Sequence, residues 1–207
     1  MMNPIFTRNQ DIDKIAFVNW RINPESEIMN LRNIGDGYLK AAIKLTKLCL
    51  INNNDKSADI LIFPILNNAN HGIEVYLKAL IWTMNSIAGS PDRTEKGHNI
   101  RQLYRSLRAK TIAYYGKGQA KDFDLVTKNV NDWITELFEK IGATDQADKM
   151  DFSRYPFNHK YEEHFYVTQF GSVEIDLENF VQRFEGIHND FENLSDYLYY
   201  NELMKDD

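Results

Sequence analysis

The sequence RFEGIH, residues 183–188, contains two side chains that could act together on a phosphate. At neutral pH the imidazole of His188 can move protons, and the guanidinium of Arg183 can stabilise negative charge on a phosphate group. Both residues lie in a stretch predicted to be the last long helix, where five positions separate the two side chains by about 140° around the helix axis. They would therefore converge only in a groove lined by another helix or by a second subunit.

The spacing of this pair indicates little by itself, because the chain contains it three times: Arg93/His98, Arg154/His159 and Arg183/His188. Only the last pair lies inside a predicted helix. His188 also falls within the apolar stripe of that helix, so a histidine packed at a seam between helices is the alternative interpretation. Gly186 lies on the opposite, polar face, where a glycine costs a helix about 1 kcal/mol, and the close approach of another chain would explain it.

A second group of polar side chains follows one face of an earlier predicted helix, in NNANHGIEVYLKAL. Glu74 and Lys78 are spaced to form an i,i+4 ion pair, which favours either a solvated helix face or a polar groove. In the groove interpretation, Glu74 pairs with an arginine from elsewhere in the chain, such as Arg154. His98, in GHNIRQLY, begins the next helix and could instead fix the loop before it. The predicted binding groove consists of His71, Glu74, Lys78, His98 and Arg154.

The charged residues are unevenly distributed along a chain whose net charge is −6. Eight basic residues lie between positions 93 and 121, and ten acidic residues lie between positions 174 and 207. Three arginines of the basic segment share one helix face and could bind successive phosphates of a nucleic-acid backbone: Arg101, Arg105 and Arg108. The alternative is that the basic and acidic segments pair with each other, within one chain or across a dimer.

Apolar residues recur at intervals of three and four along five stretches, the pattern of amphipathic helices. The predicted helices cover residues 28–50, 60–87 (or 64–87), 99–115, 123–141 and 175–203. The aromatic stretch 150–172 is interrupted by Pro156 and fits a packed loop or short hairpin. In the N-terminal extension, residues 1–27, KIAFVNWRI fits a strand or a short helix and PESE fits a helix start. The prediction is therefore one all-α domain of about five helices over residues 1–207, with an irregular aromatic segment before the last helix.

The composition limits the possible functions. The 207 residues are 43% hydrophobic, enough for a core, yet no stretch approaches the roughly 20 apolar residues of a membrane span. The first residues have no signal-peptide pattern and Cys49 has no partner for a disulfide, so a cytoplasmic protein is expected. The sequence has neither a glycine-rich phosphate loop nor a Cys/His metal pattern, and HKYEEH (159–164) fits polar surface better than a metal site. We expect no cofactor and no metal ion.

Three landmarks in the chain resemble the HEPN-type helical domains of bacteria. They are NNANHGIEVYLKALI in the second predicted helix, GHNIRQLY at the start of the third, and DFSRYPFN before the last. The resemblance covers residues 28–203 and implies an antiparallel helical bundle that pairs as a homodimer. It also implies a role in stress or phage defence, in some members beside a nucleotidyltransferase.

The resemblance implies two possible functions. In active HEPN members an Arg-x4–6-His motif lies late in the domain, and two copies meet in a dimer cleft that cleaves RNA without a metal. Only Arg183 and His188 match this motif in position, although Phe184 stands where active members usually carry a polar residue. Other members are non-catalytic dimerisation, binding or regulatory modules. The first expectation is thus a non-catalytic binding or dimerisation module, and the alternative is a metal-independent endoribonuclease that uses Arg183 and His188.

Overall fold

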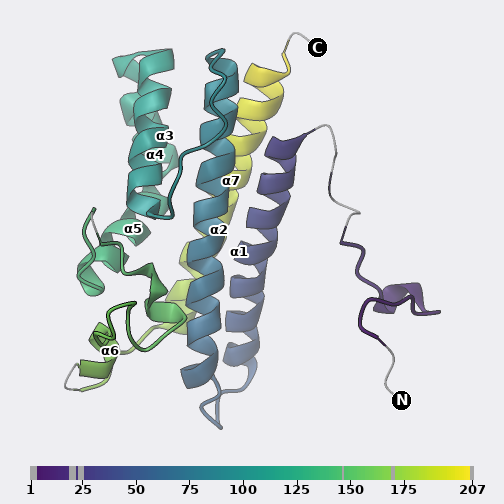
Figure 1. The fold of residues 1–207 in the computed structure, drawn as a ribbon, viewed down its shortest axis with the longest axis vertical. Helices are drawn as coiled ribbons and strands as arrows, with labels where there is room; N and C mark the ends of the chain where they lie inside the picture. The colour runs from purple at the N-terminus through teal and green to yellow at the C-terminus, as the bar shows by residue number, and fades with distance from the viewer. Residues whose placement is uncertain (1–3, 19–21, 23–25, 146, 169–170, 206–207) are drawn as a thin grey trace.

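Each of the five stretches with helical periodicity is helical in the structure. A computed structural model describes residues 4–18, 22, 26–145, 147–168 and 171–205 (Figure 1). The seven α-helices of this part of the chain are α1 (Glu27–Ile51), α2 (Ala58–Ile87), α3 (Ile100–Tyr115), α4 (Ala120–Val126), α5 (Lys128–Lys140), α6 (Phe165–Thr168) and α7 (Leu177–Asp196). No β-strand occurs among the described residues, so the predicted all-α class is confirmed.

Short polar side chains begin three of the long helices. Ser26, Asn99 and Asp176 precede α1, α3 and α7, and each accepts a hydrogen bond from the backbone N–H three residues later. Such caps satisfy N–H groups that the first helical turn leaves without partners, which is why these helices start within two residues of the predicted positions. By contrast, α2 starts at Ala58 and continues through Pro64, which is exposed.

Helix α2 lies at the centre of the fold. It runs antiparallel to α1, its most extensive neighbour, while α7 packs against α1 and α3 packs against another side of α2 (Figure 1). Buried residues from all of the long helices form one hydrophobic core cluster. Aromatic contacts join its parts: Tyr76 of α2 stacks on Phe191 of α7 with ring centroids 4.9 Å apart, and Trp133 of α5 meets Phe184 edge-on at 4.9 Å.

The predicted helix over residues 123–141 is divided at Thr127, which is buried between α4 and α5. The Thr127 hydroxyl donates to the carbonyl of Phe123 at 2.7 Å, and it lies 2.9 Å from the hydroxyl of Tyr104. Threonines inside the continuous helices α1, α2 and α3 make the same hydroxyl-to-carbonyl bond, so the contact with the Tyr104 hydroxyl is what distinguishes Thr127. The last predicted helix also differs, because α7 ends at Asp196 and the chain continues as a π-helix, Tyr197–Leu203.

The segment between α5 and α7 is irregular, with a four-residue 3₁₀-helix, Met150–Ser153, and the short helix α6. An isolated antiparallel bridge between Phe157 and Glu163 is its only β-type pairing within the described residues. The described part of the N-terminal extension contains one 3₁₀ turn, Ile12–Lys14. The expected strand or helix over KIAFVNWRI falls partly on residues 19–21, and the expected helix start partly on 24–25, all outside the described residues.

Two glycines allow α1 and α2 to pack closely. A Cβ atom at Gly35 of α1 would lie 2.8 Å from the ring of Tyr76, and one at Gly72 of α2 would lie 3.0 Å from the backbone nitrogen of Leu39. These distances are shorter than van der Waals contact, so only glycine fits at either crossing point. Gly37, two residues after Gly35, has open space around it.

We therefore predict opposite effects for two neighbouring substitutions. Gly35→Ala should lower the free energy of unfolding by about 1–3 kcal/mol, because the methyl group overpacks the helix contact. Gly37→Ala, the matched control, should raise it by about 0.5–1 kcal/mol, since alanine is the better helix former where space is free. Urea denaturation of both variants measures the difference. Equal effects of the two substitutions would contradict this account of the α1–α2 contact.

Candidate binding site

Glu74 of α2 is a buried carboxylate, 8% exposed, with three polar neighbours. One of its oxygens accepts from Lys78 Nζ at 2.8 Å and from His98 Nδ1 at 2.8 Å. The other lies 3.6 Å from Nδ1 of His71. The structure thus brings together four of the five predicted groove residues. The prediction that Glu74 pairs with Arg154 is wrong, because two histidines and a lysine occupy its oxygens.

The charge of Glu74 is fixed by these neighbours. Burial by itself would raise the pKa of Glu74, but the nearby His71 and the hydrogen bonds from Lys78 and His98 outweigh burial and lower it to about 2. Glu74 is therefore ionised and accepts hydrogen bonds. Because His98 directly precedes the cap of α3, the Glu74–His98 hydrogen bond also ties the start of α3 to the middle of α2.

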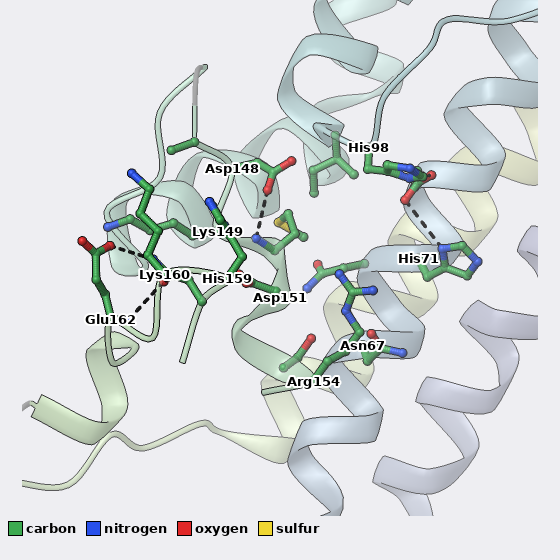
Figure 2. Close-up of a pocket in the computed structure, with 17 residues that line it drawn as sticks. Asn67, His71, His98, Asp148, Lys149, Asp151, Arg154, His159, Lys160 and Glu162 are labelled. Atoms are coloured by element: carbon green, nitrogen blue, oxygen red, sulfur yellow. Dashed lines mark hydrogen bonds and ion pairs between the residues drawn. The ribbon is translucent and has the colours of Figure 1, made fainter. Parts of the chain in front are cut away.

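A cavity of about 610 Å³ opens beside Glu74, between α2 and the irregular segment after α5 (Figure 2). Figure 2 shows His71 and His98 at one side, Arg154 beside Asn67 below, and Lys149, His159 and Lys160 on the irregular segment. Its lining residues are Asn67, Asn70, His71, Glu74, His98, Ile100, Ala147, Asp148, Lys149, Met150, Asp151, Ser153, Arg154, Asn158, His159, Lys160 and Glu162. Four predicted groove residues line this cavity, and Lys78 lies behind Glu74.

The irregular segment supplies both the lysine and arginine residues of the cavity and three of its carboxylates, those of Asp148, Asp151 and Glu162. Asn158 closes its loop by accepting hydrogen bonds from the backbone N–H groups of Lys160 and Glu162, at 2.8 and 3.1 Å. This turn and the preceding 3₁₀-helix carry Lys149, Arg154 and Lys160, all exposed. Within the part of the chain that the structure describes, none of these three side chains forms an ion pair or a hydrogen bond.

Two buried hydrogen-bond groups of the cavity wall also have no partner among the described residues. They are the side-chain nitrogen of Asn70, which is 4% exposed, and the hydroxyl of Ser153, which is 6% exposed. A buried polar group without a partner costs about 1–3 kcal/mol, so a bound molecule that pairs with both would gain from them. Of the cavity groups, the sequence indicated neither these two nor Lys149 and Lys160. In this segment the sequence pointed to DFSRYPFN, which contains Ser153 and Arg154, and to HKYEEH, which contains His159.

Arg183 and His188 do not meet within the chain. Arg183 forms an ion pair with Glu136 of α5, whereas His188 Nε2 donates to Oδ1 of Asp36 in α1 at 2.6 Å. Their partners lie on different sides of α7, as the angle between the two positions requires. The His188 side chain is 13% exposed, so it lies at a helix seam with a carboxylate partner.

Gly186 has a neighbour within its own chain. A Cβ atom there would lie 3.2 Å from Nδ2 of Asn129, which donates to a carboxylate oxygen of Asp190 at 2.8 Å. The glycine therefore leaves room for a hydrogen bond between α5 and α7. The expected close approach of a second chain is not needed to explain it.

One group of side chains in the described residues has the composition of a metal site. Ligand atoms of Asp36, His188 and Glu192 lie within 4.8 Å of one another. Each already has a protein partner, since Asp36 binds Lys40 and His188, and Glu192 accepts from Arg32 at 3.2 Å. A metal ion would have to displace these cations.

The two histidines of HKYEEH differ in exposure. His159 lines the cavity, whereas His164 is 5% exposed, so the expectation that both histidines lie on the surface is wrong for His164.

The three arginines of the predicted nucleic-acid face have partners close by. A carboxylate of α4 and one in the loop after α5 neutralise two of them, and within the described residues of this one chain they do not pair with the acidic last helix. The partners are the ring of Phe138 under Arg101 (4.0 Å), Asp145 for Arg105 (2.7 Å) and Asp124 for Arg108 (2.6 and 2.7 Å). Exposed ion pairs of this kind contribute little stability, and RNA binding by this face stays a prediction.

Comparison of the chain with known protein families, curated proteins and solved structures finds no match. Among the described helices, none combines the length and apolar character that crossing a membrane requires. The geometry of the cavity is therefore the main guide to function.

We predict that Glu74→Gln lowers the free energy of unfolding by about 2 kcal/mol at pH 7, because Lys78 and His98 lose a charged acceptor. The pKa of Glu74 is lower in the folded protein than its ordinary value of 4.5, so its charge stabilises the fold fully above about pH 4.5. That contribution is lost as the pH falls toward 2, and the difference between wild type and variant should shrink over the same range. Urea denaturation at several pH values measures it.

Glu139→Gln is the control, because Glu139 is exposed on α5. This variant should unfold like the wild type at every pH. A difference between wild type and Glu74→Gln that does not change with pH would contradict the role given to the Glu74 charge.

Proposed function

We propose that the protein is a HEPN-like, non-catalytic binding module whose ligand site is the cavity beside Glu74. One observation carries the proposal: four of the groove residues expected from the sequence line a cavity with buried polar groups that have no protein partner. Concave sites with a few converging polar groups are the usual binding sites for small molecules, and this volume lies within their range.

The chemistry of the cavity favours binding over catalysis. Glu74 has a pKa of about 2 and its oxygens are already occupied, which makes it a poor proton donor or acceptor at neutral pH. His98, however, has a side chain that is 77% exposed and holds one ring nitrogen against Glu74. Its other ring nitrogen can bond to a ligand, and the carboxylate fixes the ring orientation.

The rest of the proposal follows from the resemblance to HEPN domains. It comprises an antiparallel bundle, a homodimer, a cytoplasmic location and a role in bacterial stress or phage defence. A nucleotidyltransferase-type protein is a proposed partner. In such a system, a ligand in the cavity would control whether the module engages its partner.

A metal-independent endoribonuclease is the second candidate, because one observation favours it. The hydrogen bond from His188 to Asp36 is the arrangement in which a carboxylate orients an imidazole for proton transfer. In this candidate, Arg183 would leave Glu136 and meet the His188 of a second copy across a dimer. RNA would then lie near Arg101, Arg105 and Arg108.

The binding proposal predicts that a screen of small metabolites by thermal shift finds at least one ligand whose affinity depends on His98. His98→Ala should weaken its binding by about tenfold, the effect of losing one hydrogen bond to a polar ligand. Lys96→Ala, two residues away and outside the cavity, is the control and should bind normally. If every compound bound equally to wild type and His98→Ala, or none bound, the proposed site would be wrong.

The same proposal predicts that the purified protein does not cleave a broad RNA pool, with or without chelator. To distinguish the two candidates, RNA cleavage by wild type, His188→Ala and Arg183→Ala is compared by gel electrophoresis. Circular dichroism would verify that the His188 variant stays folded despite losing its bond to Asp36. Chelator-resistant cleavage by wild type that both variants lose would establish the ribonuclease instead.

A further inference from the structure

We infer that the ligand of the cavity beside Glu74 carries a phosphate group, bound by Arg154, Lys149 and Lys160 together with the buried side chains of Asn70 and Ser153. This inference rests on the proposed function and names the class of ligand.

The positive charges of the cavity are available. Elsewhere in the described chain, Arg105, Arg108 and Arg183 each have a carboxylate partner, whereas Arg154 and Lys149 on the cavity wall have none. A guanidinium presents several N–H donors in a plane that matches two phosphate oxygens, and an ammonium group adds charge without a fixed direction. Lys149 and Arg154 flank one short 3₁₀-helix and have no carboxylate partner. Two such cations match a ligand with several negative charges better than a ligand with one carboxylate.

The orientation of the Asn70 amide is fixed, which makes its free group a donor. Its oxygen accepts a hydrogen bond from the indole nitrogen of Trp133 at 3.0 Å. An indole N–H can only donate, so the amide oxygen must face Trp133 and the NH₂ group must face away. Asn70 lines the cavity, and its NH₂ group is buried with no partner among the described residues, so a ligand that reaches it would supply the missing acceptor. Phosphate oxygens are acceptors.

Ser153 adds a second buried donor on the opposite wall, one residue before Arg154. Its hydroxyl has no partner within the described chain and is 6% exposed. The cavity thus combines charged donors at its open side with neutral donors in its wall. A phosphate, with several oxygens pointing in different directions, can accept from both kinds at once.

The four carboxylates of the cavity already have protein partners, whereas the three cations have none within the described residues. Glu74 accepts from Lys78 and His98. The three others have partners in their own segment: the backbone N–H of Met150 for Asp148 (3.2 Å), the side-chain amide of Asn158 for Glu162 (2.7 Å) and, at ion-pair distance, His164 for Asp151 (3.4 Å). The negative charge of these carboxylates disfavours long polyanions. Their remaining lone pairs can accept hydrogen bonds from hydroxyl or amino groups of the ligand. A small phosphorylated molecule with a polar body fits both features.

The test is isothermal titration calorimetry of the full chain with inorganic phosphate, ribose 5-phosphate and AMP, each compared with its phosphate-free counterpart, ribose or adenosine. We expect at least one phosphorylated probe to bind at least tenfold more tightly than its counterpart. Arg154→Ala should weaken that binding by about tenfold or more, the usual effect of removing a charged hydrogen-bond donor. Lys44→Ala, which removes an exposed lysine on α1, should leave it unchanged.

Asn70→Asp tests the buried donor. This change keeps the oxygen that faces Trp133 and replaces the NH₂ group with a second, charged oxygen, so phosphate binding should be lost. Ser153→Ala, which removes a hydroxyl and adds nothing, is the second variant in case the first does not fold. It should weaken phosphate binding severalfold and leave thermal stability unchanged or raised.

The outcomes separate this inference from the proposed function. If a neutral or cationic metabolite binds in a His98-dependent way and Arg154→Ala has no effect, the cavity is a binding site and the phosphate inference is overturned. If phosphate probes bind equally to wild type, Arg154→Ala and Ser153→Ala, the inference is also overturned. If no metabolite of any charge binds, both the inference and the proposed function fail.

Discussion

The structure depends on the burial of α2 around almost its whole circumference. The buried polar side chains of such a helix take hydrogen-bond partners from the neighbouring elements, because little water reaches them. Asn85 does so with the carbonyl of Arg93, Glu74 with His98, and Asn70 with Trp133. These hydrogen bonds attach the loop after α2, the start of α3 and helix α5 to the central helix.

The candidate site follows from the same constraint. Where α1 crosses α2, glycines remove all side-chain volume and the two helices touch. Where the irregular segment after α5 passes α2, most of the facing side chains are polar and a cavity remains between the two. One helix therefore has a dry, close contact along one side and a polar, open one along another. The buried charge of Glu74 lies on the open side, where histidines can approach it.

The helices could be predicted from the sequence because their signals are local. Apolar spacing and the caps at Ser26, Asn99 and Asp176 depend only on neighbouring residues. The break at Thr127 could not be predicted, because its buried partner Tyr104 is distant in the sequence. For the same reason, the site was predicted on α2, where residues recur on one face, and largely missed on the irregular segment, which has no periodicity to place Lys149 or Lys160.

The ion pairs of the charged residues explain why the Arg-x4-His motif and the cavity beside Glu74 differ as candidate sites. In Arg-x4-His the two residue types suggest joint chemistry, but the helix turns them about 140° apart, and each finds its own carboxylate. The guanidinium of Arg183 would have to leave Glu136 before it could offer its charge to a substrate. Arg154 and Lys149 have no such partner to lose within the described chain, and they share a cavity with buried donors that also lack one. Availability for bonding, more than residue type or spacing, therefore favours the cavity over the Arg-x4-His pair as the proposed ligand site.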